Sequence, residues 1–299
     1  MPDFGIMRGF NEKLFGDKLV AGQLPTQLGL IGSTTIGLLL DEYPNAAAAY
    51  SLRKLRFLYT GNAIRVRRSS DNAEQDIGFS SGNLDTTALT TFCSGTNGFV
   101  TTWYDQSGNG YNATQTTAAN QPQIVSSGNV LTLTGVAAAK PCLSFDGTND
   151  SFNFTTITAP QFTTFYPSKK AVNADLSAWF TRSEGIASPY SPIIFGTNGT
   201  YIGNQSKSTF SSSYNNNNYI LMSGYIDSSN NGFIQINNSA ITLGLTIVDL
   251  GTNGFNSIGK RGLTNLSKCN VPEMILYGFD NSAKISGINT NINTYYGIY

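Results

Sequence analysis

Hydrophobic and polar residues alternate along two stretches in the first half of the chain. In residues 99–104 the even-numbered and odd-numbered side chains fall on opposite sides of an extended chain: Val100, Thr102 and Tyr104 on one, Phe99, Thr101 and Trp103 on the other. In residues 64–67, Ile64 and Val66 alternate with two arginines. A period of two predicts a strand in each stretch. The first strand should stop at the polar turn of residues 105–110, where two glycines can adopt positive φ.

Short apolar runs recur through the second half of the chain. They cover residues 142–154, which read as strand, turn and strand, and then residues 176–182, 193–195, 219–226, 232–237, 240–243 and 255–259. Residues 233–241 predict a hairpin with Asn237 and Asn238 at its turn. A last strand is expected at residues 271–279, with Pro272 at its edge. Strands at this spacing predict an all-β antiparallel sandwich.

Three segments have helical patterns. Residues 46–59, after a possible N-cap at Asn45, are rich in alanine and leucine and predict a helix whose basic residues are solvated or paired with Asp71, Glu74 and Asp76. Residues 84–92 predict a short helix opened by Asn83 or Asp85. Residues 283–295 predict a C-terminal helix capped by Ser282, with an apolar face formed by Ile285, Ile288 and Ile292.

Residues 1–40 are apolar and rich in glycine but poorly periodic, so they do not read as part of the sandwich. A segment without a core of its own needs a partner surface, which predicts a docking arm followed by one domain at residues 41–299. The expected docking side chains are Phe4, Ile6, Met7, Phe10, Leu14 and Phe15. The alternative is an extension folded over the domain's own sheet.

Composition narrows the possible functions. The chain has 18 basic and 18 acidic residues, a formal net charge of zero and no histidine. A nucleic-acid binder normally has a basic excess, and catalysis by a histidine base is excluded. Three widely spaced cysteines predict buried free thiols rather than disulfides or a zinc site. Residues 28–40 are apolar but too short to span a bilayer, and the N-terminus lacks the pattern of an export signal.

Several motifs resemble a known family. Residues 50–56 (YSLRKLR), 63–71 (AIRVRRSSD) and 103–110 (WYDQSGNG) are similar to the N-terminal portion of the arabinofuranosidase B catalytic domain. They resemble even more closely a set of non-enzymatic bacteriophage structural proteins that reuse this module. The resemblance covers residues 41–150, and it resumes at residues 273–283 and 292–299. It implies a concanavalin A-like, laminin-G-like antiparallel β-sandwich with a few peripheral helices and an extended N-terminal arm.

Candidate chemistry is sparse. A retaining glycosidase needs two carboxylates on one sugar site, and of the five glutamates only Glu184 lies near the expected place. Hard oxygen ligands for calcium are available in two loops, at Asp105, Asn109 and Asn112 and at Asp146, Asn149 and Asp150, although ordinary turn chemistry is favoured there. Glycan stacking could use Tyr190, Tyr201, Tyr214 and Tyr219, which are otherwise half-buried packing residues.

These observations predict a bacteriophage virion structural protein, a head fibre, spike or tail-fibre component located in the virion, and not an enzyme. It is expected to bind other virion proteins through its arm, to form a homo-oligomer and to contact a host-surface polysaccharide. No cofactor, nucleic acid or membrane span is expected, apart from the possible calcium. The alternatives are a glycoside hydrolase of the arabinofuranosidase type and a secreted carbohydrate-binding adhesin.

Overall fold

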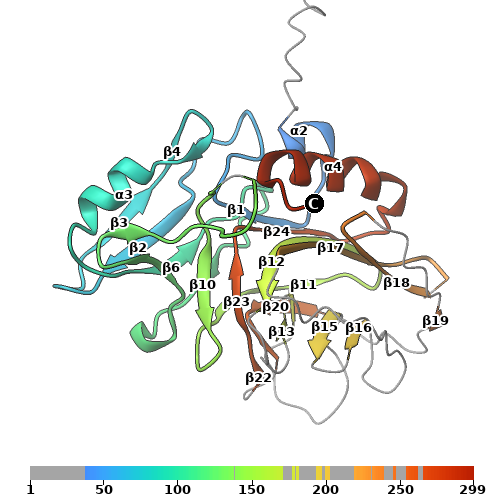
Figure 1. Ribbon diagram of the computed structural model, residues 1–299. Coiled ribbons are helices and arrows are strands. Elements are labelled where there is room, and N and C mark those ends of the chain that lie inside the picture. The colour runs from blue at the N-terminus through green and yellow to red at the C-terminus, as the bar shows by residue number, and fades with distance from the viewer. Residues whose placement is uncertain are drawn as a thin grey trace, which may run out of the picture. The chain divides into compact units, whose positions relative to one another are not determined.

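A computed structural model describes residues 38–137, 139–170, 177–178, 180–181, 193–196, 199–202, 219–229, 231–238, 245–246, 254–261 and 265–299 (Figure 1). The two halves of the chain meet in one antiparallel hydrogen-bonded network that curls into two facing layers. This part of the chain confirms the expected all-β sandwich with a few peripheral helices.

The first layer contains most of the strands, and neighbouring strands pair antiparallel throughout. One side of the sheet runs in the order β19 (Leu245–Thr246), β18 (Asn231–Ile236), β17 (Tyr219–Ile226) and β12 (Phe162–Lys170). Beside β12 lie the consecutive strands β23 (Lys268–Val271) and β24 (Glu273–Tyr277), of which β23 pairs on its other side with β10 (Leu143–Asp146) and β24 with β1 (Ala48–Ser51). From β10 the sheet continues through β8 (Gln123–Ser126), β6 (Gly98–Trp103), β2 (Ile64–Arg68) and β3 (Glu74–Ile77). A short strand, β9 (Asn129–Val130), pairs with β8.

The second layer begins where β6 also pairs with β7. From β7 (Ala113–Thr114) it continues through β11 (Phe152–Thr158) and β20 (Gly254–Ile258) to β14 (Phe180–Thr181). Small separate sheets are formed by β4 (Phe79–Ser80) with β5 (Asn83–Leu84), by β13 (Ser177–Ala178), β15 (Ile193–Gly196) and β16 (Gly199–Ile202), and by β21 (Lys260–Arg261) with β22 (Asn265–Leu266).

Most helices in the described residues are short. These residues form α2 (Leu39–Glu42), α3 (Thr86–Phe92), the longer α4 (Ile285–Tyr296) and the 3₁₀ turns Ala118–Asn120 and Ser282–Lys284. In α3, Asp85 is the N-cap and its carboxylate accepts from the Ala88 N–H at 2.9 Å, as expected for this helix. Helix α4 crosses the outer face of the first layer beside α2 (Figure 1). Among the described residues, no helix combines the length and apolar character needed to cross a bilayer.

Two hydrophobic cores hold the layers. The first lies between the layers and is rich in aromatic rings, with Trp103 against Tyr50 and Phe152 at ring centroid distances of 5.7 and 6.4 Å. The second lies between the first layer and helices α2 and α4, and it includes Leu39, Ile288 and Ile292. The predicted apolar face of the C-terminal helix is therefore confirmed.

The alternation expected in β6 is interrupted. Val100 and Trp103 are both fully buried although they were expected on opposite faces. The register shifts between β6 and β2 at Arg65 and Val66, and again between β6 and β8 at Gly98 and Phe99. Such irregularities bend a strand and allow it to pass from one layer to the next. The strand itself was predicted correctly.

The predicted helix at residues 46–59 is wrong. Residues 48–51 form β1, which is buried along its whole length and pairs with β24. Asn45 does not cap a helix but has a positive φ of 68°. Helix propensity is a weak prior that tertiary pairing routinely overrides, and here the pairing with β24 buries the small alanine side chains.

Three further details of the second half differ from expectation. Pro272 separates β23 from β24, and β24 is an interior strand between β1 and β12. Ser282 begins the 3₁₀ turn before α4 and makes no side-chain cap. Asn237 and Asn238 have positive φ values of 49° and 57°, as a two-residue hairpin turn requires, but the partner strand expected at residues 240–243 lies outside the described residues.

Candidate functional site

The loop after β6 is organised around the buried carboxylate of Asp105, which is 4% exposed. Its Oδ1 accepts from the backbone N–H groups of Ala49 and Ser107, both at 2.9 Å. Its Oδ2 accepts from the Ser107 hydroxyl at 2.7 Å and the Tyr111 N–H at 3.0 Å. Four donors on one carboxylate fix the loop and hold it against β1, so Asp105 acts as a scaffold for this region.

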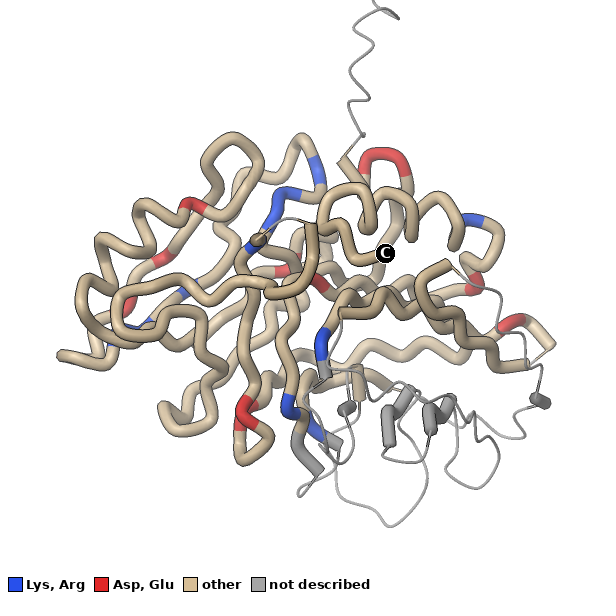
Figure 2. Tube along the Cα trace, viewed as in Figure 1, with Lys and Arg blue, Asp and Glu red and all other residues tan. Residues whose placement is uncertain are grey.

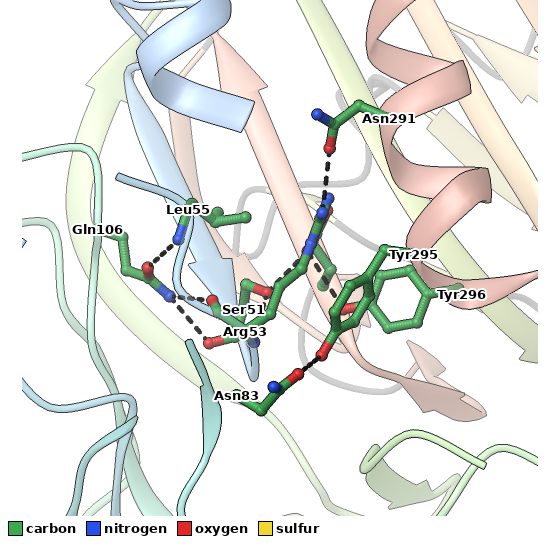
Figure 3. Close-up of polar contacts among 9 residues, drawn as sticks. Ser51, Arg53, Leu55, Asn83, Gln106, Asn291, Tyr295 and Tyr296 are labelled. Atoms are coloured by element: carbon green, nitrogen blue, oxygen red, sulfur yellow. Dashed lines mark hydrogen bonds and ion pairs between the residues drawn. The ribbon is translucent and has the colours of Figure 1, made fainter. Parts of the chain in front are cut away.

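Gln106 ties the same loop to the segment that follows β1. Its Oε1 accepts from the Leu55 N–H at 2.8 Å, and its Nε2 donates to the carbonyls of Ser51 and Arg53, each at 3.0 Å (Figure 3). The side chain is fully buried. These bonds satisfy backbone groups of residues 51–55. They add to the bonds from the Leu52 N–H to the Pro272 carbonyl and from the Lys54 N–H to the Gly82 carbonyl, so several partners hold this extended segment.

A pocket of about 280 Å³ opens beside this loop. It is lined by Leu40, Pro44, Asn45, Ala46, Arg56, Ser107, Gly108 and Asn109. The Asn109 amide donates to the carbonyls of Ala46 and Ala47, each at 3.0 Å, and Arg56 Nη1 donates to the Ser107 carbonyl at 3.3 Å. The walls therefore carry amide, carbonyl and guanidinium groups, and none of the eight lining residues is an aspartate or glutamate.

A second polar cluster is sealed inside the molecule between β1, β24 and α4 (Figure 3). Arg53 donates from Nε and Nη2 to the two oxygens of Glu273, at 2.7 and 3.0 Å, and the two side chains are 7% and 0% exposed. Ser51 and Tyr296 also donate to Glu273 Oε2, at 2.7 and 3.1 Å. Burial would lower the pKa of Arg53, but the Glu273 carboxylate raises it above its ordinary value.

The basic residues of this segment were expected to be solvated or to pair with acidic residues of β3 and its flanking turn. Arg56 is exposed as expected, but Arg53 is buried against Glu273 and lies 4.7 Å from the Tyr295 ring centroid. The acidic residues bind other arginines: Arg65 pairs with Glu74 and Asp76, and Arg68 pairs with Asp71. Charged residues are otherwise scattered along the described chain rather than gathered in one patch (Figure 2).

Asp150 is a buried carboxyl group whose pKa departs clearly from its ordinary value. It lies in the turn between β10 and β11, and its Oδ2 accepts from the Asp146 N–H at 2.9 Å. Burial is the main cause that raises the pKa of Asp150 from 3.8 to about 6, against the opposing effect of this hydrogen bond. A carboxyl group with such a pKa can hold a proton in mildly acidic solution.

The residues proposed for calcium make turn contacts. Asp105 accepts four protein donors, Asn112 Oδ1 accepts from the Asp105 N–H at 3.0 Å, and Asn109 donates from its nitrogen to carbonyls. In the other loop, Asp146 Oδ1 accepts from the Thr148 and Asn149 N–H groups at 2.7 and 3.2 Å. These are the contacts that ordinary turn chemistry predicts, and calcium binding stays a prediction.

Few of the other sequence-derived site residues can be placed. Tyr219 is 3% exposed and packs in the second core, so its ring is not available to stack on a sugar. Tyr190, Tyr214, Glu184 and the docking residues Phe4, Ile6, Met7, Phe10, Leu14 and Phe15 lie outside the described residues, as does the side chain of Tyr201. Cys93, Cys142 and Cys269 are buried free thiols, as predicted.

Comparison with known proteins identifies the type of domain that this chain resembles. The family model "Alpha-L-arabinofuranosidase B, catalytic" matches residues 41–149, the region over which the sequence motifs resemble that family. A probable α-L-arabinofuranosidase B of Aspergillus terreus is 35% identical over 117 residues, which are 36% of this chain and 21% of that protein. An α-L-arabinofuranosidase of Hypocrea jecorina is 42% identical over 73 residues, 24% of this chain and 15% of that protein. The matched regions thus span only 21% and 15% of these relatives.

Solved structures extend the likeness beyond the matched sequence. A GH54 α-L-arabinofuranosidase soaked with a cyclic sulfate inhibitor superposes with a TM-score of 0.59 at 18% identity, covering 85% of this chain and 64% of that chain. An arabinofuranosidase complexed with arabinofuranosyl-α-1,2-xylobiose gives a TM-score of 0.56 with the same identity and coverage. At this identity the likeness establishes a shared fold.

These matches correct the functional interpretation of the sequence. The virion structural protein is contradicted, because the family model, the relatives and the solved structures are arabinofuranosidases. The expectation that the chain is not an enzyme is contradicted by the same matches, which point to a glycosidase. The closer resemblance to bacteriophage proteins was therefore wrong, whereas the resemblance to the arabinofuranosidase B catalytic domain is supported.

Proposed function

We propose that this chain is a glycoside hydrolase of the arabinofuranosidase type. The observation that carries the proposal is the match of the arabinofuranosidase B catalytic family model to residues 41–149. The shared fold supports it, because the likeness to GH54 arabinofuranosidases covers 85% of the chain, well past the matched residues. The substrate would be an α-L-arabinofuranoside, at the end of a side chain or in a small glycoside.

The chemistry requires two carboxyl groups on one sugar site. Two of the three buried carboxyl groups of the described chain are engaged elsewhere, because Asp105 and Glu273 each accept several hydrogen bonds that hold the scaffold. Asp150 accepts from the Asp146 N–H, and burial raises its pKa to about 6, so we propose it as the proton donor. Glu184, the sequence-derived candidate for the second carboxylate, lies outside the described residues.

Release of 4-nitrophenol from 4-nitrophenyl α-L-arabinofuranoside by the purified chain tests the proposal. Glu184→Gln and Asp150→Asn are expected to lower kcat/KM by about 10²–10⁴-fold, the usual contribution of a positioned acid or base. If Asp150 is the acid, Asp150→Asn also removes the alkaline limb of the pH profile. Glu42→Gln is the control, because Glu42 is exposed on α2 and should leave the rate unchanged.

Two outcomes would count against the proposal at different levels. A wild-type chain that releases no pentose from the aryl glycoside or from arabinan contradicts the activity itself. Hydrolysis that survives both substitutions leaves the activity standing and assigns the two reacting carboxyl groups to other positions.

A further inference from the structure

Two large apolar residues lie at the corners of an exposed turn. The Tyr59 N–H donates to the Arg56 carbonyl at 3.1 Å, which places Phe57 and Leu58 at the two central positions. Their side chains are 73% and 75% exposed. The turn is anchored, since the Phe57 N–H donates to Asp41 Oδ2 at 2.8 Å. Glycine, asparagine, aspartate and proline are the usual residues at such corners, so the turn itself does not require a phenylalanine and a leucine here.

This turn adjoins the pocket described above, and Arg56 belongs to both. Arg56 donates Nη1 to the pocket wall at Ser107, and its Nε and Nη2 make no hydrogen bond within the described chain. Asn45, another lining residue, is exposed, and its amide likewise has no partner among these residues. The pocket thus offers unused donors and an amide oxygen. The exposed Phe57 directly follows the lining residue Arg56 in the chain, and the Lys54 ammonium lies 5.8 Å from its ring centroid.

The absence of any carboxylate among the eight lining residues separates this pocket from a hydrolytic centre, which needs a pair of them. Its volume of about 280 Å³ is near the lower end of the range for small-ligand sites. Neutral hydroxyl groups match the amide and guanidinium donors without adding a charge to the site. The exposed ring of Phe57, next in the chain to the lining residue Arg56, offers a flat apolar surface to the C–H face of a sugar ring.

We propose that the pocket beside the Arg56–Tyr59 turn is a non-catalytic binding subsite for a neutral glycan chain, with one sugar in the pocket and the next stacked on Phe57. The choice of an arabinose-substituted polysaccharide as the glycan rests on the proposed function. The site would hold the polymer on the surface of the domain while a side chain is cleaved elsewhere.

Native affinity electrophoresis of the full chain in gels containing neutral arabinoxylan tests this site. Wild type should be retarded, and Phe57→Ala should weaken binding by about tenfold, which is the loss of one aromatic contact. Phe57→Trp should retain binding. Asn45→Gly removes the amide while tolerating the φ of 68°, and it should weaken binding several-fold.

Leu58→Ala is the matched control, because Leu58 is equally exposed but has no ring to offer a sugar. It should bind arabinoxylan as tightly as wild type. If Leu58→Ala loses as much as Phe57→Ala, or if sedimentation shows self-association that both substitutions abolish, the turn is an apolar contact between copies and the proposal is overturned. Wild type that migrates unretarded also overturns it.

Hydrolysis of the small aryl arabinofuranoside by the same variants separates this inference from the proposed function. Phe57→Ala and Asn45→Gly should leave that rate unchanged. If the chain binds arabinoxylan through Phe57 but has no hydrolytic activity, the subsite is supported and the proposed enzymatic function is contradicted. If the chain hydrolyses the substrate and its binding does not depend on Phe57, only the subsite is contradicted.

Discussion

At the scale of single residues, the polar side chains that hold the fold together are buried and hydrogen-bonded. They are Arg53, Glu273, Asp105 and Gln106. Arg53 and Glu273 lie 220 positions apart in the chain and form a two-fold hydrogen-bonded ion pair under α4. The sequence contains no local signal for this pair, since neither residue belongs to a motif with the other. Asp105 and Gln106 are different, because their unusual loop sequence indicated an important site, although their structural role became clear only from their partners.

The buried ion pair should be far more sensitive to substitution than an exposed one. Glu273→Gln leaves the Arg53 charge buried without its counterion, and we expect the free energy of unfolding to fall by about 3–5 kcal/mol. Asp71→Asn, which removes the exposed partner of Arg68, should cost far less, because solvent screens an ion pair at the surface. Urea denaturation measures both. Equal costs for the two substitutions would contradict the internal role of the pair.

Asp150 should make stability depend on pH in the direction opposite to a salt-bridged carboxylate. Because its folded pKa is raised from 3.8 to about 6, the folded state binds the proton more tightly than the unfolded state. This contribution is complete below about pH 4 and is lost as the pH rises through about 6. Asp150→Asn does not titrate, so its stability relative to wild type should increase by about 2 kcal/mol between pH 4 and pH 8. A pH-independent difference in thermal denaturation would contradict this assignment.

At the scale of elements, strands with a clear two-residue period could be predicted from the sequence, and β1 could not. Ile64 and Val66 of β2 are buried between arginines as expected, because one face of that strand meets the core. Ala48 and Ala49 of β1 favour a helix locally, and only the contacts with β24 and with Asp105 make them extended. The interrupted alternation of β6 could not be predicted either. It depends on how β6 pairs with separate neighbours, β2 and β7, and the sequence of β6 does not indicate this.

The end of α4 provides a test of packing at this scale. Gly297 has a φ of 63°, and an added Cβ would lie 2.6 Å from Ala137 Cβ. Gly110 also has positive φ, at 80°, but no atom lies within 4 Å of its added Cβ. We expect Gly110→Ala to cost about 1–2 kcal/mol from backbone conformation alone, and Gly297→Ala to cost more because of the additional clash. Thermal unfolding of the two variants is the measurement, and a smaller loss for Gly297→Ala would show that α4 ends differently.

At the scale of the whole molecule, the sandwich could be predicted from the spacing of short apolar runs, and the resemblance to the arabinofuranosidase B catalytic domain from three motifs. The functional class was predicted wrongly. Residues 41–150 carry the motifs shared with arabinofuranosidases, and in this structure Asp105 and Gln106 serve the scaffold. Motifs that stabilise a fold can be shared by proteins of different activity. The pocket beside residues 44–46 could not be predicted from the sequence, because its other wall comes from residues 107–109, about sixty positions later in the chain.

The pairing of β1 with β24 has a consequence for how the protein is made. Ala48 faces Leu276, so β1 has no pairing partner until β24 has been synthesised. A nascent chain emerging from the ribosome therefore carries an open strand edge until β24 appears. Chaperone occupancy on stalled nascent chains should persist until β24 has left the exit tunnel, and then fall abruptly.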